Sequence, residues 1–214
     1  GAISMLYLSK NLKRFRIAKN LTQEDIAEFL CITPQSVSKW ERGESYPDIT
    51  FLPALANILE TSIDALIGMD IIRAEQTRYN IHKTASEFQQ NDDYESAEKV
   101  YRDALLSYPN NPGMILGLGG VLALQGKSEE AIELMERGLS LSTNEKQKAT
   151  TRAALCFLYL KCDKTEKASA LAASLPHTRE SREIIQPLIS KGMSEDEIDK
   201  NIKTILLGDV NILW

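Results

Sequence analysis

Polar side chains gather in residues 33–43 at spacings that would place them on one side of a short helix. They supply an amide, two hydroxyls and an ammonium group: Gln35, Ser36, Ser38 and Lys39. The apolar Val37 and Trp40 would face the opposite way, toward a core. Amide, hydroxyl and ammonium groups can form hydrogen bonds with base edges in a DNA groove and with phosphates. This stretch is therefore a candidate recognition surface.

The residues just before it predict a second helix that would support the first. Thr22 is a candidate N-cap, and Asp25 can complete a capping box in place of the usual Glu. A turn at Cys31-Ile32 then leads to Thr33, which can cap a helix that has Pro34 at its first position. Two short helices joined by a tight turn form the helix-turn-helix arrangement that reads DNA.

Apolar periodicity predicts three further helices, over residues 8–18, 49–59 and 62–66. The first would carry four cationic residues on its open side: Lys10, Lys13, Arg14 and Arg16. The five helices would enclose a small core made of Phe15, Ile26, Val37, Trp40, Leu52, Leu55 and Leu66. We expect this domain to occupy residues 5–69. Residues 1–4, before Met5, are expected to be a remnant of a cleaved expression tag.

The net charge of −5 would argue against a nucleic-acid partner if it were spread evenly, but the charge is unevenly distributed. Residues 8–43 hold seven basic and four acidic residues, whereas residues 74–214 hold seventeen basic and twenty-one acidic ones. Because salt screens charges over about 8 Å, the local balance matters more than the total. The charge is therefore compatible with DNA contact through the N-terminal end.

Four ordered segments in this region resemble one known family. They are TQEDIA at 22–27, SVSKWERGES at 36–45, the turn Tyr46-Pro47-Asp48, and SIDALIG at 62–68. Together they resemble the DNA-binding domain of the xenobiotic-response-element family, the Cro and phage-repressor type of helix-turn-helix. The resemblance covers about residues 8–68 and implies a five-helix, lambda-repressor-like domain. Cys31 departs from the pattern, because the family often has Gly there, and it is expected to carry some backbone strain.

The resemblance also implies roles for matching residues. Gln23 would bind a phosphate together with nearby backbone N–H groups, and Arg42 would contact the DNA backbone. The residues along the major groove would be Thr33, Pro34, Gln35, Ser36, Ser38 and Lys39. Gln35 would read adenine through its amide, while Lys39 would donate to guanine or to a phosphate. The alternative is a helical hairpin whose polar face is merely solvated.

After Gly68 an internal repeat begins, with Ala97 and Ala131 in register 34 residues apart. The first unit contains Ile81, Thr84-Ala85, Phe88, Ala97, Tyr101 and Pro109. The second contains Ile115, Leu118-Gly119, Leu122, Ala131 and Met135, with Thr143 in place of Pro. A weaker third unit contains Leu155-Cys156, Tyr159 and Ala168. The pattern resembles a tetratricopeptide array, in which small residues let neighbouring helices approach closely. A generic helical bundle is the alternative.

The C-terminal part predicts a last pair of helices, over residues 178–192 and 194–207. Ser194 and Glu197 form a capping box, and Pro187 should kink or restart the first helix. The apolar tail GDVNILW at 208–214 could seal the last repeat or form a dimer contact. We expect the repeats and this cap to form one domain over residues 70–214.

The sequence holds no catalytic constellation. His82 and His177 belong to different units and are expected on the surface or on helix faces, and no GxxxxGK[ST] loop is present. Gly117–Gly120 lies within a helix pattern, where tight packing explains it better than phosphate binding. The odd number of cysteines favours reduced thiols, and no apolar run could cross a bilayer. We expect no enzyme, cofactor or metal, and a cytoplasmic location.

These features predict an all-α protein: a bacterial-type transcriptional regulator whose N-terminal domain binds double-stranded DNA. A homodimer on a palindromic operator is expected, because two-fold protein symmetry matches paired half-sites. The repeats would bind a peptide or protein effector and contribute to dimerisation. The competing hypothesis is an adaptor that binds a protein through its repeats and is only localised by its DNA-binding domain.

Overall fold

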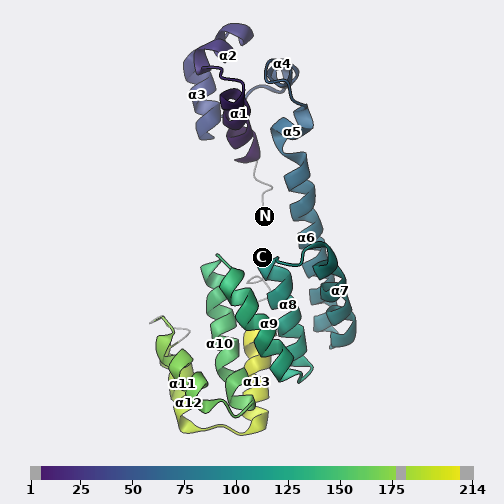
Figure 1. Ribbon diagram of the computed structural model, residues 1–214, viewed down its shortest axis with the longest axis vertical. Coiled ribbons are helices and arrows are strands. Elements are labelled where there is room, and N and C mark those ends of the chain that lie inside the picture. The colour runs from purple at the N-terminus through teal and green to yellow at the C-terminus, as the bar shows by residue number, and fades with distance from the viewer. Residues whose placement is uncertain (1–5, 177–181, 208–214) are drawn as a thin grey trace. The chain divides into compact units, whose positions relative to one another are not determined.

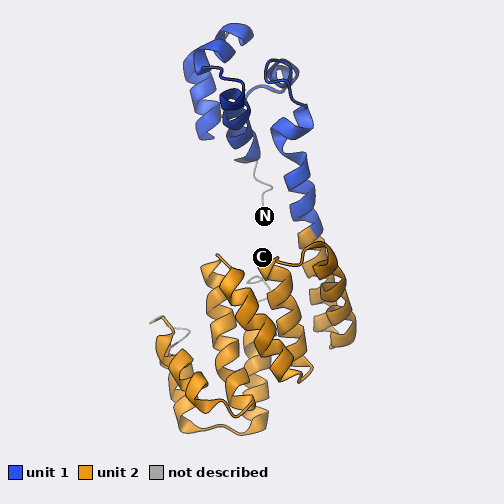
Figure 2. Ribbon diagram, in the orientation of Figure 1, with its two compact units in different colours: residues 1–77 blue, residues 78–214 orange. Residues whose placement is uncertain are grey.

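The computed structural model describes residues 6–176 and 182–207, and these ranges contain helices and loops without a β-strand. The predicted all-α class is confirmed. The chain divides into two compact units, residues 1–77 and residues 78–214 (Figures 1 and 2). None of the described helices has the length and apolar character needed to cross a membrane.

The N-terminal unit contains the five predicted helices. They are α1 (Leu6–Ala18), α2 (Gln23–Leu30), α3 (Pro34–Arg42), α4 (Leu52–Ile58) and α5 (Ile63–Ile67). The predicted helix at 49–59 begins instead with a 3₁₀ turn, η1 (Ile49–Phe51), because Asp48 accepts a hydrogen bond from the Thr50 N–H at 2.9 Å. The buried core includes Leu8, Leu12, Ile26, Val37, Trp40, Leu55, Leu59 and Leu66.

The long helix α6 (Met69–Gln90) continues into the C-terminal unit, where it is followed by seven more helices. They are α7 (Tyr94–Ser107), α8 (Pro112–Leu124), α9 (Ser128–Leu141), α10 (Glu145–Lys161), α11 (Thr165–Ser174), α12 (Arg182–Lys191) and α13 (Glu195–Leu207). Three of the loops that join paired helices contain a left-handed residue, at Asp92, Gly126 and Asp163. Each left-handed residue turns the chain at a predicted helix break.

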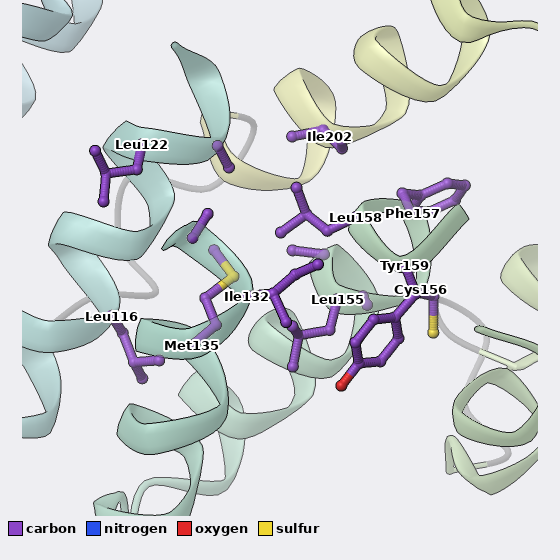
Figure 3. Close-up of a cluster of buried hydrophobic side chains, with 14 of the residues drawn as sticks. Leu116, Leu122, Ile132, Met135, Leu155, Cys156, Phe157, Leu158, Tyr159 and Ile202 are labelled. Carbon is purple, nitrogen blue, oxygen red and sulfur yellow. The ribbon is translucent and has the colours of Figure 1, made fainter. Parts of the chain in front are cut away.

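The small residues of the repeat pattern lie where helices approach one another. Ala85, Ala97, Ala131 and Ala168 are fully buried. Large side chains fill the space beside them, including Leu116, Leu122, Ile132, Met135 and Leu155 (Figure 3). The packing explanation for Gly117–Gly120 is also confirmed, because these glycines lie in the buried interior of α8. The two predicted repeats thus share one continuous apolar core with the third.

The expected position of His82 needs correction, and two expectations fall outside the described residues. His82 is buried rather than on the surface, and its Nδ1 lies 3.0 Å from the Tyr101 hydroxyl. α12 continues through Pro187, so the helix does not restart there, and a kink at Pro187 stays a prediction. His177 and the apolar tail at 208–214 lie outside the described ranges.

Two glycines of α8 form a matched test of this packing. A methyl group at position 117 would lie 2.4 Å from Cζ of the buried Tyr101, whereas one at position 120 would meet nothing closer than Leu206 Cδ2 at 3.7 Å. Both Gly→Ala changes gain the same helix propensity, so their difference isolates the clash. We expect Gly117→Ala to be less stable than Gly120→Ala by about 1–3 kcal/mol. Urea denaturation followed by circular dichroism would measure this, and equal stabilities would contradict the packing shown.

Candidate nucleic-acid interface

α2 and α3 are joined by a turn whose geometry the capping residues fix. Thr22 Oγ1 accepts a hydrogen bond from the Asp25 N–H at 3.1 Å, and Asp25 Oδ2 accepts one from the Thr22 N–H at 2.7 Å. The predicted capping box is therefore confirmed. Cys31 ends α2 in the left-handed conformation with φ 55°, which agrees with the expected strain. The short connection holds the two helices in a fixed relation.

The inner face of α3 anchors the helix in the domain core. Val37 is fully buried, and Trp40 is nearly so, with its ring centroid 5.9 Å from that of Phe51. Trp40 is therefore a core residue, as its position in the apolar pattern predicts. Because the inner face is fixed, the residues on the outer face of α3 have a defined orientation.

The outer face of α3 carries a stripe of long polar side chains. Gln35, Lys39 and Arg42 are all exposed and follow one another at spacings of four and three residues, so they lie on one side of the helix. Within the described ranges, the side chains of Gln35 and Lys39 make no hydrogen bond or ion pair with the protein. Their donors and acceptors are available to another molecule.

The shorter predicted contact residues lie beside this stripe and are partly used within the helix. Thr33 Oγ1 accepts a hydrogen bond from the Ser36 N–H at 3.3 Å, and the two hydroxyls are 3.0 Å apart. Pro34 occupies the first helical position. The hydroxyl of Ser38 accepts a hydrogen bond from Arg42 Nη1. Thr33 and Ser36 thus set the start of α3, and their hydroxyls are already engaged with each other.

Arg42, the last residue of α3, is exposed but has an acidic partner in the loop that follows the helix. Its Nε and Nη2 donate to the two carboxylate oxygens of Glu44 at 2.6 and 2.8 Å. The hydrogen bond with Glu44 raises the pKa of Arg42 and lowers that of Glu44. Because both side chains are about half exposed, water and salt screen this pair, and another anion can compete with Glu44 for Arg42. Arg42 is placed to make such an exchange.

A buried polar cluster behind α3 was not foreseen from the sequence. Glu41 accepts hydrogen bonds from Arg16 Nε at 2.6 Å and Arg16 Nη2 at 2.9 Å, and Arg16 Nη1 donates to the Leu21 carbonyl at 2.8 Å. The Glu41 side chain is only 3% exposed and that of Arg16 only 13%. The placement of Arg16 on the open side of the first helix is therefore wrong, because its guanidinium turns inward to Glu41. Lys10, Lys13 and Arg14 are exposed as predicted.

Gln23, the predicted phosphate contact, belongs to the same cluster. Its Nε2 donates to Glu41 Oε2 at 2.8 Å. Because an amide nitrogen carries two hydrogens, one N–H remains for another acceptor while Glu41 holds the side chain in place. Burial alone would raise the pKa of Glu41, but the hydrogen bonds from Arg16 and Gln23 outweigh it and lower the pKa. The carboxylate therefore stays charged and keeps Gln23 oriented at neutral pH.

The cluster links three residues that are distant in the sequence. In the sequence, the only sign of this cluster was Glu41, an acidic residue next to Trp40 near the otherwise basic end of its helix.

The described residues contain no group of three or more His, Cys, Asp or Glu side chains that could hold a metal ion. The chemistry available here is hydrogen bonding and charge pairing.

Family comparisons place this geometry among known domains. Residues 12–66 match the helix-turn-helix family model, and residues 88–148 match the tetratricopeptide repeat model. The chain is 36% identical over 78 residues to the HTH-type transcriptional activator BcrR of Enterococcus faecalis, which spans 35% of this chain and 38% of that protein. It is 34% identical over 80 residues to the HTH-type transcriptional regulator ImmR of Bacillus subtilis. That match covers 37% of this chain and 63% of ImmR.

These matches cover less than two thirds of the relatives' own lengths. Among solved structures, the chain is similar to Bacillus thuringiensis PlcR, crystallised in complex with the peptide PapR7 and DNA. That likeness has 16% identity and a TM-score of 0.44, and it covers 95% of this chain and 72% of that one. The family matches together with the geometry of α2 and α3 lead to one conclusion: the chain combines a helix-turn-helix domain of the xenobiotic-response-element type with tetratricopeptide repeats.

Proposed function

We propose that the protein is a sequence-specific transcriptional regulator that inserts α3 into the major groove of double-stranded DNA. The observation that carries this proposal is the outer face of α3, where Gln35 and Lys39 are exposed and make no hydrogen bond or ion pair within the described ranges. The opposite face is fixed by Val37 and Trp40. A rigid helix with available polar groups can bind base edges without a large loss of side-chain entropy.

The proposed contacts fall into two classes. Gln35 would pair with adenine, and Lys39 would donate to guanine or a phosphate. Thr33, Pro34, Ser36 and Ser38 would lie along the groove beside them. Gln23 would bind a phosphate through its second amide hydrogen, with backbone N–H groups at the start of α2, and Arg42 would exchange Glu44 for a phosphate.

Enrichment from a randomised DNA pool at two salt concentrations tests the proposal directly. A regulator should select one sequence, and its affinity for that sequence should fall steeply as salt rises, because counterions are released from each phosphate contacted. Binding without sequence enrichment would exclude sequence-specific regulation. It would leave the adaptor alternative, in which the N-terminal domain only localises a protein-binding repeat domain.

Two substitutions in α3 separate base contacts from phosphate contacts. Gln35→Ala is expected to weaken binding to the selected sequence by about 1–3 kcal/mol and to relax the preference at one base pair. Arg42→Ala should weaken binding to all sequences alike and reduce the salt slope by about 1. Titrations on the selected site and on single-base variants measure both effects. Identical outcomes for the two variants would contradict the division of roles.

The proposed division of labour assigns DNA to residues 5–69 and an effector peptide or protein to residues 70–214. A homodimer on a palindromic operator is part of the proposal, since one small module rarely supplies enough affinity alone and a two-fold dimer reads two half-sites. The relatives BcrR and ImmR, named as a transcriptional activator and a transcriptional regulator, support the regulatory role of the DNA-binding domain. Sedimentation of the protein with and without the selected DNA would measure the number of chains bound for each site.

A further inference from the structure

The turn that ends α3 fixes the position of Glu44. Gly43 is left-handed, with φ 73°, and its N–H donates to the Trp40 carbonyl at 3.1 Å. The Glu44 N–H donates to the Lys39 carbonyl at 3.0 Å, which completes a Schellman motif. The backbone of Glu44 is therefore held directly beyond the helix, and its side chain returns to Arg42, the last member of the polar stripe on α3.

The Glu44 carboxylate occupies an edge of Arg42 that suits a phosphate. Its two oxygens accept hydrogen bonds from Nε at 2.6 Å and from Nη2 at 2.8 Å. Carboxylate and phosphate groups both bind a guanidinium through two parallel hydrogen bonds of this kind. Nη1 donates to the Ser38 hydroxyl, so each of the three nitrogens already has an acceptor. A phosphate that binds the same edge of Arg42 must therefore displace Glu44.

Exposure distinguishes this pair from the pair behind α3. Glu41 holds Arg16 through the same two-oxygen geometry, but the Glu41 side chain is only 3% exposed and is shielded from other molecules. The side chains of Arg42 and Glu44 are 53% and 52% exposed. A phosphate can therefore reach Arg42, and water can solvate the carboxylate of Glu44 when it is released.

Helix stability does not account for an acidic residue at this position. The C-terminus of a helix carries partial negative charge, which repels a carboxylate. The hydrogen bond from Arg42, together with the charges of Arg42 and Lys39, lowers the pKa of Glu44 below its ordinary value of 4.5. The carboxylate is therefore charged at neutral pH, and the groups that attract it belong to the polar stripe of α3.

We propose that Glu44 competes with DNA phosphates for Arg42, and that it thereby sets the affinity of the protein for DNA without changing the sequence that is read. The proposal rests on the proposed function, in which Arg42 contacts the DNA backbone. Because Glu44 is tethered beside Arg42, its carboxylate competes at a high effective concentration. Each contact between Arg42 and a phosphate requires its release.

This role differs from the one assigned to Gln35. Phosphates are the same in every sequence, so the competition should weaken binding to every duplex by the same factor. A residue that reads a base would change the preference at one position instead. Removal of the Glu44 charge should therefore raise the affinity for selected and unrelated DNA alike and leave the enriched sequence unchanged.

The test compares Glu44→Gln with the wild-type chain in anisotropy titrations of two fluorescein-labelled duplexes. One duplex carries the sequence that the wild type enriches, and the other carries an unrelated sequence. The variant keeps the shape of the side chain and loses its charge. We expect it to bind both duplexes about two- to fivefold more tightly, because an exposed ion pair is worth only a small factor.

Glu28→Gln is the matched control for the change in net charge. Glu28 lies on α2 and is exposed, and within the described ranges its side chain makes no hydrogen bond or ion pair. Its substitution makes the same charge change in the same unit without releasing an arginine. Its affinity for both duplexes should stay close to that of the wild type.

A double-mutant cycle with Arg42→Ala separates competition for Arg42 from simple repulsion of DNA. A carboxylate near DNA lowers affinity by repulsion whether or not Arg42 is present. If Glu44 acts through Arg42, the gain from Glu44→Gln should shrink in the Arg42→Ala background to the gain that Glu28→Gln gives in the wild type. An equal gain in both backgrounds, or no gain in either, would overturn the proposal.

The same titrations separate this proposal from the proposed function. An enriched sequence together with an uncoupled cycle would overturn the role of Glu44 and leave sequence-specific binding intact. Failure to enrich any sequence would overturn the proposed function, while the cycle on the unrelated duplex still tests Glu44. Absence of binding to any DNA would overturn both.

Discussion

Replacing Glu41 with alanine is expected to destabilise the N-terminal unit by about 3–5 kcal/mol, the cost of removing one partner of a buried ion pair. The substitution leaves the Arg16 side chain, 13% exposed, with the Leu21 carbonyl as its one remaining hydrogen-bond acceptor among the described residues. It also removes the acceptor that holds Gln23. This single change should therefore lower the stability of the domain and release the side chain of Gln23, the proposed phosphate contact.

Trp40 provides the measurement, because it lies in the core of the same unit. The chain has one other tryptophan, Trp214, so a Trp214→Phe background makes the fluorescence report on Trp40 alone. Urea titration in this background should show an earlier midpoint for Glu41→Ala. Glu44→Ala, which removes the exposed partner of Arg42, is the matched control and should leave the midpoint nearly unchanged. Similar midpoints for both variants would contradict the buried pair.

The same cluster predicts a dependence on pH. Because the pKa of Glu41 is lower in the folded protein than its ordinary value of 4.5, its contribution to stability is complete above that value. It is lost as the pH falls through the lowered pKa of the folded state. The wild-type N-terminal unit should therefore lose stability in acid more steeply than Glu41→Ala.

The features that follow from neighbouring residues were predictable from the sequence. The capping box of Thr22 and Asp25, and the start of α3 at Thr33 and Pro34, depend on hydrogen bonds that span three residues. The repeat was predictable for a similar reason, since its small residues recur at a fixed spacing. Local chemistry and periodicity were sufficient to identify the helices and both kinds of domain.

Contacts between distant residues were not predictable in the same way. Arg16 has the same charge as Lys13 and Arg14, and only the fold brings it to Glu41. The sequence was compatible with His82 on either the buried or the exposed face of its helix. In the fold it is buried against Tyr101. The amphipathic pattern of α13 predicted a buried face but gave no information on which helices would cover it. In each case the burial of a side chain depends on the residue that the fold brings next to it, and not on its own type or its neighbours in the sequence.

Acidification from pH 7 to pH 5 is expected to destabilise the C-terminal unit by about 2 kcal/mol through His82 alone. His82 is 5% exposed, its Nδ1 is 3.0 Å from the Tyr101 hydroxyl, and the two rings meet edge to face. Burial, with a smaller effect from the charge of Arg78, lowers the pKa of His82 to about 4. The unfolded chain binds a proton near pH 6.5, whereas the folded one resists it. Stability is therefore complete above pH 6.5 and declines as the pH falls toward 4.

Calorimetry at several pH values would measure this loss, and the transition that Gly117→Ala shifts identifies the C-terminal unit. His82→Gln, which keeps a polar group near Tyr101, should abolish most of the decline between pH 7 and 5. His177→Gln is the matched control and should retain the decline. Carboxylates with lowered pKa values, such as Glu98 at about 2, lose their contributions only at lower pH, so they do not interfere in this window. If the stability of His82→Gln still declined between pH 7 and 5, a group other than this buried histidine would cause the pH dependence of the C-terminal unit.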